Sequence, residues 1–120
     1  MNNNLFYINT NFLIYLFVKE EEEGIRIINK LKEVNLCTST LTYDEFIWVI
    51  RKISNKETSL KASDYFLNLD FLKILELNKE TLTISNEAMK EFDLKPRDSL
   101  HYASMKQKQI KNIVTDDKDF

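Results

Sequence analysis

Glycine, proline, cysteine and histidine each occur only once among the 120 residues of this chain. The single glycine, Gly24, lies within a helical pattern, which excludes the glycine-rich phosphate loops of many nucleotide-binding enzymes. The single cysteine, Cys37, excludes an intramolecular disulfide and suits a reducing compartment. The longest apolar run, residues 12–18, is far too short to cross a bilayer, and no secretory leader is recognisable. These absences predict a cytoplasmic protein that does not enter the membrane.

Charged residues are abundant but balanced. The chain has 17 Lys and Arg residues against 19 Asp and Glu residues, which gives a formal net charge of −2. Its overall field therefore does not attract nucleic acid as that of a strongly basic chain would, and such a partner has to be argued from local features. The chain is 43% hydrophobic and has no repeat or change of composition, so the sequence predicts a single globular domain over residues 1–120.

Apolar periodicity predicts strands and helices in alternation. The strands are expected at residues 5–8, 35–38, 72–77 and 112–115. The helices are expected at residues 11–18, 19–33, 42–54, 57–69, 79–92 and 97–109. Strands that are joined through helices form a parallel sheet covered on both faces. The predicted fold class is therefore α/β, a three-layer α/β/α sandwich with a central parallel sheet of four to five strands.

The same periodicity predicts which helical side chains face the core. In the helix at 19–33 the inner residues are expected to be Ile25, Ile28 and Leu31. In the helix at 42–54 they are expected to be Phe46, Val49, Ile50 and Ile53.

Polar and mostly acidic residues come directly after the predicted strands or in the first turn of the helices near them. They are Asn9, Thr10 and Asn11 after the first strand, Glu45 after the second, Asp98 before the last, and Asp116, Asp117 and Asp119 after the last. In parallel sheets, ligands bind at the carboxyl ends of strands, above all where the strand order reverses. We therefore expect these four segments to gather at one edge of the sheet.

In this order the four segments resemble the PIN domain, the nuclease fold of the VapC toxins of prokaryotic toxin–antitoxin systems. The stretch "INTNFLIYLF" is similar to the family's strand, Asp-Thr-Asn and apolar helix, except that Asn9 takes the place of the first Asp. Glu45 matches the family's Glu early in a helix, Asp98 within "PRDSLHYA" matches its third acidic residue, and Asp117 within "TDDKDF" matches its fourth. The resemblance covers nearly the whole chain.

The resemblance implies a metal-dependent ribonuclease that hydrolyses single-stranded or loop RNA. Asn9, Glu45, Asp98 and Asp117 are the implied metal and catalytic residues. Hard cations such as Mg²⁺ or Mn²⁺ suit these oxygen ligands, and the ion would activate a water and stabilise the phosphate. Possible auxiliary residues are Thr10, Asn11, Thr115 and Asp119. The implied partners are an RNA substrate, a second copy in a homodimer, and an antitoxin whose segment enters the active-site groove.

Two departures from the family pattern qualify this expectation. Asn9 is neutral, so the site has one negative charge fewer with which to attract the ion, and weak or absent activity is expected. The alternative function is a non-catalytic PIN-like module that binds an antitoxin or RNA. The sequence also stops at Phe120, where the family usually continues into a further edge strand, so the sheet is expected to have four strands rather than five.

Each candidate residue also has a purely structural explanation. Thr42 and Glu45 fit a helix capping box, Asp98 suits the first turn of a helix that begins near Pro96, and Thr10 or Asn11 suits an N-cap. The acidic residues 116–119 fit a solvated terminus. His101 is interpreted as a buried histidine whose hydrogen bonds are satisfied, with contact to substrate as the alternative. Trp48 is interpreted as a core residue, with a place at the site or at a dimer surface as the alternative.

Overall fold

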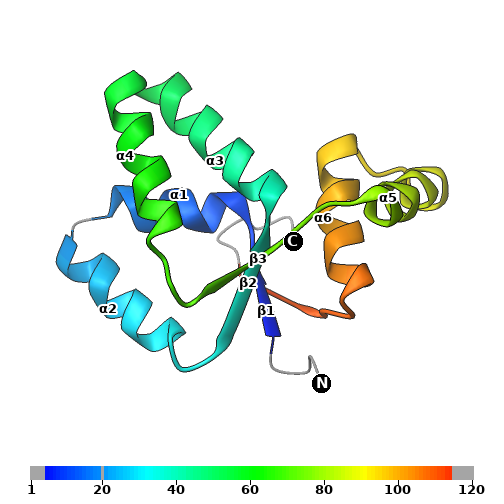
Figure 1. Cartoon of the computed structure of the whole chain (residues 1–120), viewed down its shortest axis with the longest axis horizontal. Helices are drawn as coiled ribbons and strands as arrows, with labels where there is room; N and C mark the ends of the chain where they lie inside the picture. Colours follow the sequence, from blue (N-terminus) through cyan, green and yellow to red (C-terminus); the bar gives the residue numbers. More distant parts are fainter. Residues whose placement is uncertain (1–4, 20, 115–120) are drawn as a thin grey trace.

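The computed structural model describes residues 5–19 and 21–114. In this part of the chain four strands form one parallel sheet in the order β3-β2-β1-β4 (Figure 1). The strands are β1 (Leu5–Ile8), β2 (Asn35–Ser39), β3 (Leu72–Leu75) and β4 (Asn112–Val114). The helices are α1 (Thr10–Val18), α2 (Glu21–Leu31), α3 (Thr40–Ile53), α4 (Lys56–Leu67), α5 (Lys79–Phe92) and α6 (Pro96–Gln107). The predicted α/β class and the parallel sheet are confirmed.

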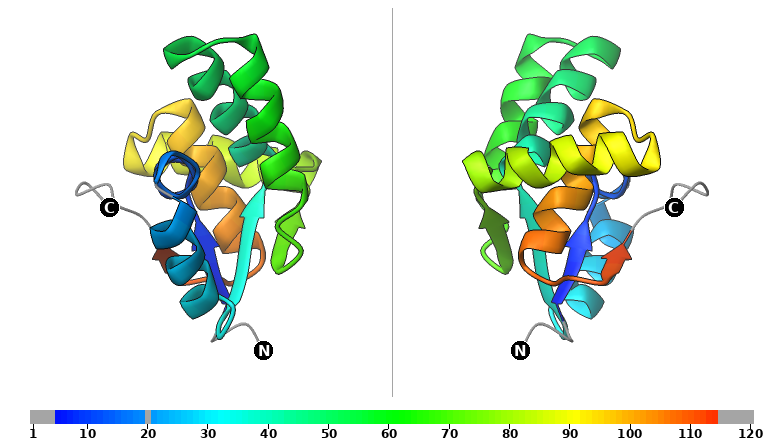
Figure 2. Two further views of the ribbon diagram at one scale, coloured as in Figure 1. Left: turned by 90° about the vertical axis from the view of Figure 1, so that its left-hand side faces the viewer. Right: turned by 90° about the vertical axis from the view of Figure 1, so that its right-hand side faces the viewer.

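Helices cover both faces of this sheet. In Figure 2, α1 and α2 lie in front of the strands in the left view, whereas α5 and α6 lie in front of them in the right view. Successive side chains of a strand point to opposite faces. Ile8 of β1 accordingly packs into a cluster with side chains of α1, α3 and α4, and the preceding Tyr7 packs on the other face with Cys37 and Leu75. No helix in the described residues has both the length and the apolar character needed to cross a bilayer.

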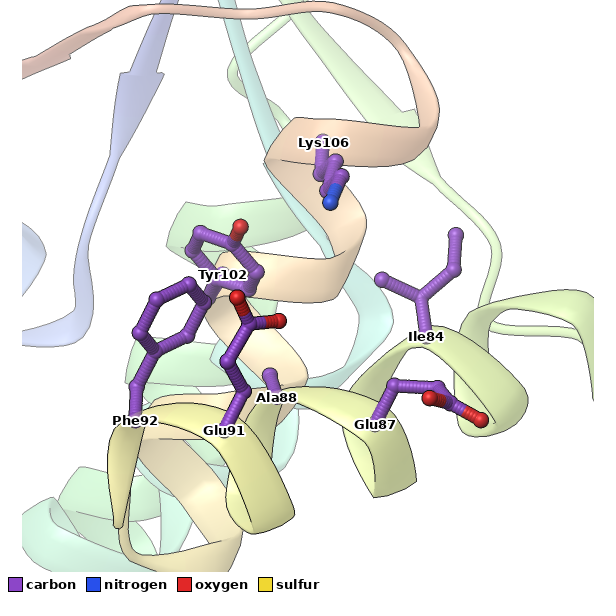
Figure 3. Close-up of a pocket in the computed structure, with 7 residues that line it drawn as sticks. All are labelled: Ile84, Glu87, Ala88, Glu91, Phe92, Tyr102 and Lys106. Carbon is purple, nitrogen blue, oxygen red and sulfur yellow. The ribbon is translucent and has the colours of Figure 1, made fainter.

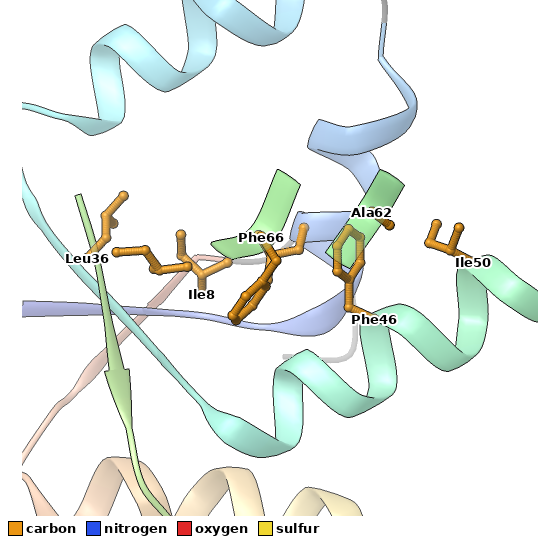
Figure 4. Packing of buried hydrophobic residues seen from close by; sticks show 8 residues of the cluster. Ile8, Leu36, Phe46, Ile50, Ala62 and Phe66 are labelled. Atoms are coloured by element: carbon orange, nitrogen blue, oxygen red, sulfur yellow. The ribbon is translucent and has the colours of Figure 1, made fainter. Parts of the chain in front are cut away.

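The larger core cluster joins β1 and β2 to the paired helices α3 and α4. Figure 4 shows Ile8 and Leu36 of the sheet near Phe46, Ala62 and Phe66 of these helices. Phe46 is fully buried, and its ring lies edge-on to that of Phe17. The cluster fixes the position of α3 and therefore that of Glu45, which directly precedes Phe46.

Two residues that were predicted to face inward are exposed. Ile53 is 63% exposed, because α3 and α4 extend beyond the carboxyl edge of the sheet and Ile53 ends the projecting helix (Figure 1). Ile25 is 51% exposed, because α2 turns the buried Gly24 toward α1 instead. A Cβ at Gly24 would lie 3.6 Å from the carbonyl oxygen of Leu16. Neighbouring positions of a helix are about 100° apart, so Ile25 points away from α1.

The first and last strands are neighbours in the sheet. β1 pairs in parallel with β4, and the Asn9 N–H donates to the Val114 carbonyl oxygen at 3.3 Å. The chain passes from β1 through β2 to β3 and then returns to the far side of β1. The carboxyl end of β1 is therefore a switch point of the kind at which α/β sheets bind ligands.

Candidate active site

Asn9 occupies the switch point and caps α1. Its side-chain Oδ1 accepts a hydrogen bond from the backbone N–H of Phe12 at 3.1 Å, and the residue is only 5% exposed. Asn is among the preferred N-cap residues because its side chain satisfies an amide that the helix leaves unpaired. Thr10 and Asn11, the caps suggested from the sequence, lie instead in the first turn of the helix. The polar triplet thus ends a buried strand and starts a helix within three residues.

Glu45 points from α3 toward the start of α1. Thr10 donates its hydroxyl hydrogen to Glu45 Oε1 at a distance of 2.5 Å between the oxygens. The capping box suggested for Glu45 is wrong, because α3 begins after Ser39 and Thr42 lies within the helix. Glu45 therefore joins two helices that follow neighbouring strands, and it does not cap its own helix.

His101 of α6 completes the group around Glu45. Its Nε2 lies 2.6 Å from Glu45 Oε1, and its Nδ1 lies 2.7 Å from the hydroxyl oxygen of Tyr7. Tyr7 donates in turn to Ser39 Oγ at 2.8 Å. Burial raises the pKa of the Tyr7 hydroxyl, so the hydroxyl keeps the proton that it donates. The interpretation of His101 as a satisfied buried histidine is confirmed, but its contact with Glu45 also makes it part of the site, which sequence reasoning missed.

The structure also places Arg97 near Glu45, whereas the remaining predicted residues are only partly placed. Arg97 lies beside Glu45, with 3.9 Å between Arg97 Nε and Glu45 Oε2. Asp98 is exposed in the first turn of α6, where a carboxylate offsets the positive end of the helix dipole. Asp117, Thr115 and Asp119 lie outside the described residues. The structure therefore brings together Thr10, Glu45, Arg97 and His101, and the convergence of Asp98 and Asp117 on the same pocket stays a prediction.

The PIN domain family model matches residues 6–120 of this chain. The chain belongs to the PIN domain family. Among curated relatives, Ribonuclease VapC2 of Methanocaldococcus jannaschii is 27% identical over an alignment that covers all of this chain and 89% of the relative. The PIN fold and the VapC-type ribonucleases of toxin–antitoxin systems are thus the family background of this chain.

Solved structures show the same PIN fold at low sequence identity. The sarcin-ricin loop cleaving toxin VapC20 of Mycobacterium tuberculosis is 17% identical, with a TM-score of 0.77 over 95% of this chain and 91% of that one. A toxin–antitoxin complex from Klebsiella pneumoniae is 20% identical, with a TM-score of 0.70 over 96% of this chain and 89% of that one. The likeness extends over nearly the whole fold.

The candidate ligands of this PIN domain are of the type that a hard cation prefers, but the described residues bring too few of them together to hold one. Asn9, Glu45 and Asp98 offer the oxygen ligands that Mg²⁺ and Mn²⁺ prefer. The described residues contain no group of three or more His, Cys, Asp or Glu side chains able to hold a metal ion. Arg97 places a positive charge beside Glu45. The donors thus fit the ion in chemistry, and a fuller ligand set requires another carboxylate, for which Asp117 is the predicted source.

A separate cavity lies between α5 and α6. It has a volume of about 240 Å³, and Ile84, Phe92, Tyr102 and Lys106 are among the residues that line it (Figure 3). None of the predicted PIN site residues lines this cavity. It is therefore distinct from the candidate active site at the end of β1.

The surroundings of Glu45 favour its ionised form. Burial raises the pKa of the Glu45 carboxyl, but the hydrogen bonds from His101 and Thr10, with the electrostatic attraction of His101 and Arg97, outweigh this effect. The pKa of Glu45 is consequently lower than its ordinary value. The site thus keeps a negative charge ready at neutral pH.

This lowered pKa predicts a pH-dependent contribution of Glu45 to stability. Because the pKa is lower in the folded chain than in the unfolded one, the contribution is complete above the unfolded value, about 4.3, and is lost as the pH falls through the folded value. We expect the stability difference between the natural chain and Glu45→Gln to shrink with acidification. Urea unfolding at a series of pH values measures it, with the exposed Glu87→Gln as the control. A difference that stays constant with pH would contradict the prediction.

The hydroxyl of Tyr7 is expected to stabilise the site through His101. Tyr7→Phe leaves His101 Nδ1 without this partner in a buried setting, and we expect a loss of about 1–3 kcal/mol in the free energy of unfolding. The imidazole NMR signals should shift as well, and they are assigned directly because His101 is the only histidine.

The matched control is Tyr43→Phe, which removes a partly buried hydroxyl that bonds to Ser63 Oγ at 2.7 Å. It should cost less stability and leave the His101 signals in place. Equal shifts of these signals in both variants would contradict a specific contact between Tyr7 and His101.

Proposed function

We propose that this PIN domain is a divalent-metal-dependent endoribonuclease of the VapC toxin type that hydrolyses phosphodiester bonds in RNA. The observation that carries the proposal is the position of Glu45. It is ionised, and Thr10 and His101 hold it against the start of α1, at the switch point of the sheet. A family of ribonucleases supplies the context in which such a carboxylate serves catalysis.

The residues around the switch point have complementary roles in this proposal. Asn9, Glu45, Asp98 and Asp117 would hold Mg²⁺ or Mn²⁺. When bound, the ion would supply an activated water and stabilise charge on the phosphate. Thr10 and His101 orient the carboxylate of Glu45, and the amides at the start of α1 offer a favourable end for an anion. Asn11, Thr115 and Asp119 would contribute further hydrogen bonds to waters or phosphate oxygens.

The second candidate function is a non-catalytic PIN-like module that binds RNA or an antitoxin. Asn9 favours it, because this residue is neutral and its Oδ1 is already engaged by the Phe12 amide. The lack of a three-residue metal group in the described part of the chain favours it as well. The two candidates share the site around Glu45 and differ in whether an ion binds there.

Cleavage of a short unstructured oligoribonucleotide tests the ribonuclease proposal. We expect slow cleavage with Mn²⁺ or Mg²⁺, its loss on addition of a chelator, and its loss in Glu45→Gln. The exposed Glu87→Gln on α5 serves as the control for an equal change of charge. Cleavage that Glu45→Gln leaves intact would point to a contaminating nuclease and would count against the proposal.

We further propose that this chain forms a homodimer and binds an antitoxin. A toxin–antitoxin complex among the structures with the same fold supports the second part. Support for both parts comes from α3 and α4, where Ile53, Leu60 and Leu67 are each more than half exposed. Sedimentation at micromolar concentrations should show a dimer, and a strict monomer would contradict it. The predicted cytoplasmic location and single domain over residues 1–120 stay predictions.

A further inference from the structure

Trp48 lies on the surface beside the candidate active site. It is 52% exposed, so the interpretation of this residue as part of the core is wrong. It is also the only tryptophan of the chain. Two cations lie over its ring: Lys52 Nζ is 4.3 Å from the ring centroid, and Arg97 Cζ is 5.8 Å from it.

Trp48 continues the surface that begins at Glu45. Positions three or four residues apart share one side of a helix, so Glu45, Trp48 and Lys52 follow one another along α3. At about 1.5 Å per residue, Trp48 lies about 4.5 Å and Lys52 about 10.5 Å along the helix from Glu45. Arg97 of α6 contacts both Glu45 and Trp48: its Nε lies 3.9 Å from Glu45 Oε2, and its guanidinium lies over the Trp48 ring. The site is thus continuous with an aromatic ring flanked by positive charge.

We propose that Trp48 is a stacking platform for a nucleobase of single-stranded RNA, with Lys52 and Arg97 meeting the neighbouring phosphates. The inference rests on the proposed ribonuclease function, which places the scissile phosphate near Glu45. Proteins bind unpaired RNA by stacking its bases on aromatic rings and by pairing its phosphates with Lys and Arg side chains.

Charge complementarity distinguishes RNA from other occupants of this surface. An apolar peptide would have to place uncharged surface against Lys52 and Arg97, whereas a polyanion satisfies both cations. Two exposed acidic residues are nearby in the sequence: Asp44 precedes Glu45, and Asp98 follows Arg97. Because the chain is weakly acidic overall, such a local arrangement is the kind of feature that RNA affinity requires here.

Binding without cleavage tests the inference. A short unstructured oligoribonucleotide, titrated in the presence of a chelator, should quench the fluorescence of Trp48, which reports on this position alone. By anisotropy of the labelled RNA, Trp48→Leu should raise the Kd about tenfold, and Trp48→Phe should restore most of the affinity because the ring is kept. The matched control is Phe92→Leu. Phe92 is an aromatic residue on α5 that is 51% exposed, and we expect this variant to bind RNA as the natural chain does.

The outcomes separate this inference from the proposed function. A higher Kd in Trp48→Leu with rescue by Phe supports the platform, whether or not the chain cleaves RNA. Equal Kd values for Trp48→Leu and Phe92→Leu, in a chain that does cleave, would overturn the platform and leave the ribonuclease in place. Fluorescence that changes with protein concentration and not with RNA would also overturn it, because a second copy would then cover Trp48.

Discussion

Replacing Asn9 with aspartate is expected to give this chain strong divalent-metal binding and to raise RNA cleavage by about 100-fold or more. Asn9 is buried at the end of β1, where its Oδ1 caps α1. An aspartate keeps this cap with one oxygen and offers the second oxygen, with its charge, to the ion. Removal of one partner from a buried ion pair costs about 3–5 kcal/mol, and about 1.4 kcal/mol corresponds to a factor of ten. Restoring the charge is therefore expected to have a large effect.

Cleavage assays and metal titrations of the same samples measure this gain. Calorimetry should show tighter Mn²⁺ binding by Asn9→Asp, and its melting temperature should rise with Mn²⁺ and fall again with chelator. Adding Asp98→Asn should remove the gain. Asn86→Asp, which adds the same charge on the exposed side of α5, should have no such effect. A folded Asn9→Asp protein that binds no divalent ion and cuts no RNA would make the non-catalytic module the better account.

Phe46→Ala is expected to cost about 3–5 kcal/mol of stability, the range for large aromatic residues in a core. The side chain of Phe46 is fully buried. Its ring centroid lies 5.7 Å from that of Phe17 and 6.3 Å from that of Phe66. Because this cluster joins α3 to the sheet, the cavity would weaken the packing of the helix that carries Glu45 and Trp48. Denaturant unfolding measures the loss.

The control for Phe46→Ala is Leu82→Ala on α5, whose side chain is 54% exposed. A surface change of this kind usually alters stability by no more than about 0.5 kcal/mol. A loss in Phe46→Ala that is no larger than that in Leu82→Ala would contradict the assignment of Phe46 to the centre of the core.

Much of the fold follows from the pattern of apolar residues. The bounds of β1 and α5 agree with the prediction, and the other helices and strands of the described residues differ from it only at their ends. Periodicity did not predict the exposure of Ile53, because it shows which side of a helix is apolar but not where the supporting sheet stops. It did not predict the exposure of Ile25 either, because the close approach of α2 to α1 involves Gly24, which has no apolar side chain, whereas Leu31 packs against the core as predicted.

Less of the site follows from the sequence. Glu45 was identified from its place early in a helix after a strand. Thr10 was expected at the same edge of the sheet, but its hydrogen bond to Glu45 and the contact of His101 with Glu45 were not predicted. Thr10 and His101 lie 35 and 56 residues away along the chain and meet Glu45 only in three dimensions. The signal that was available for His101 is its position one turn after Asp98 in a chain with no other histidine.

The wide sequence separation of the site residues has a consequence for biosynthesis. Tyr7 and His101 are 94 residues apart, and β1 gains its neighbour β4 only through residues 112–114. Such non-local contacts form late, and a ribosome delivers the N-terminal partners long before the C-terminal ones. The hydrogen bond between His101 and Glu45 therefore cannot form while α6 is still untranslated. The site is therefore incomplete during most of synthesis, while the growing chain is still attached to the ribosome and close to ribosomal RNA.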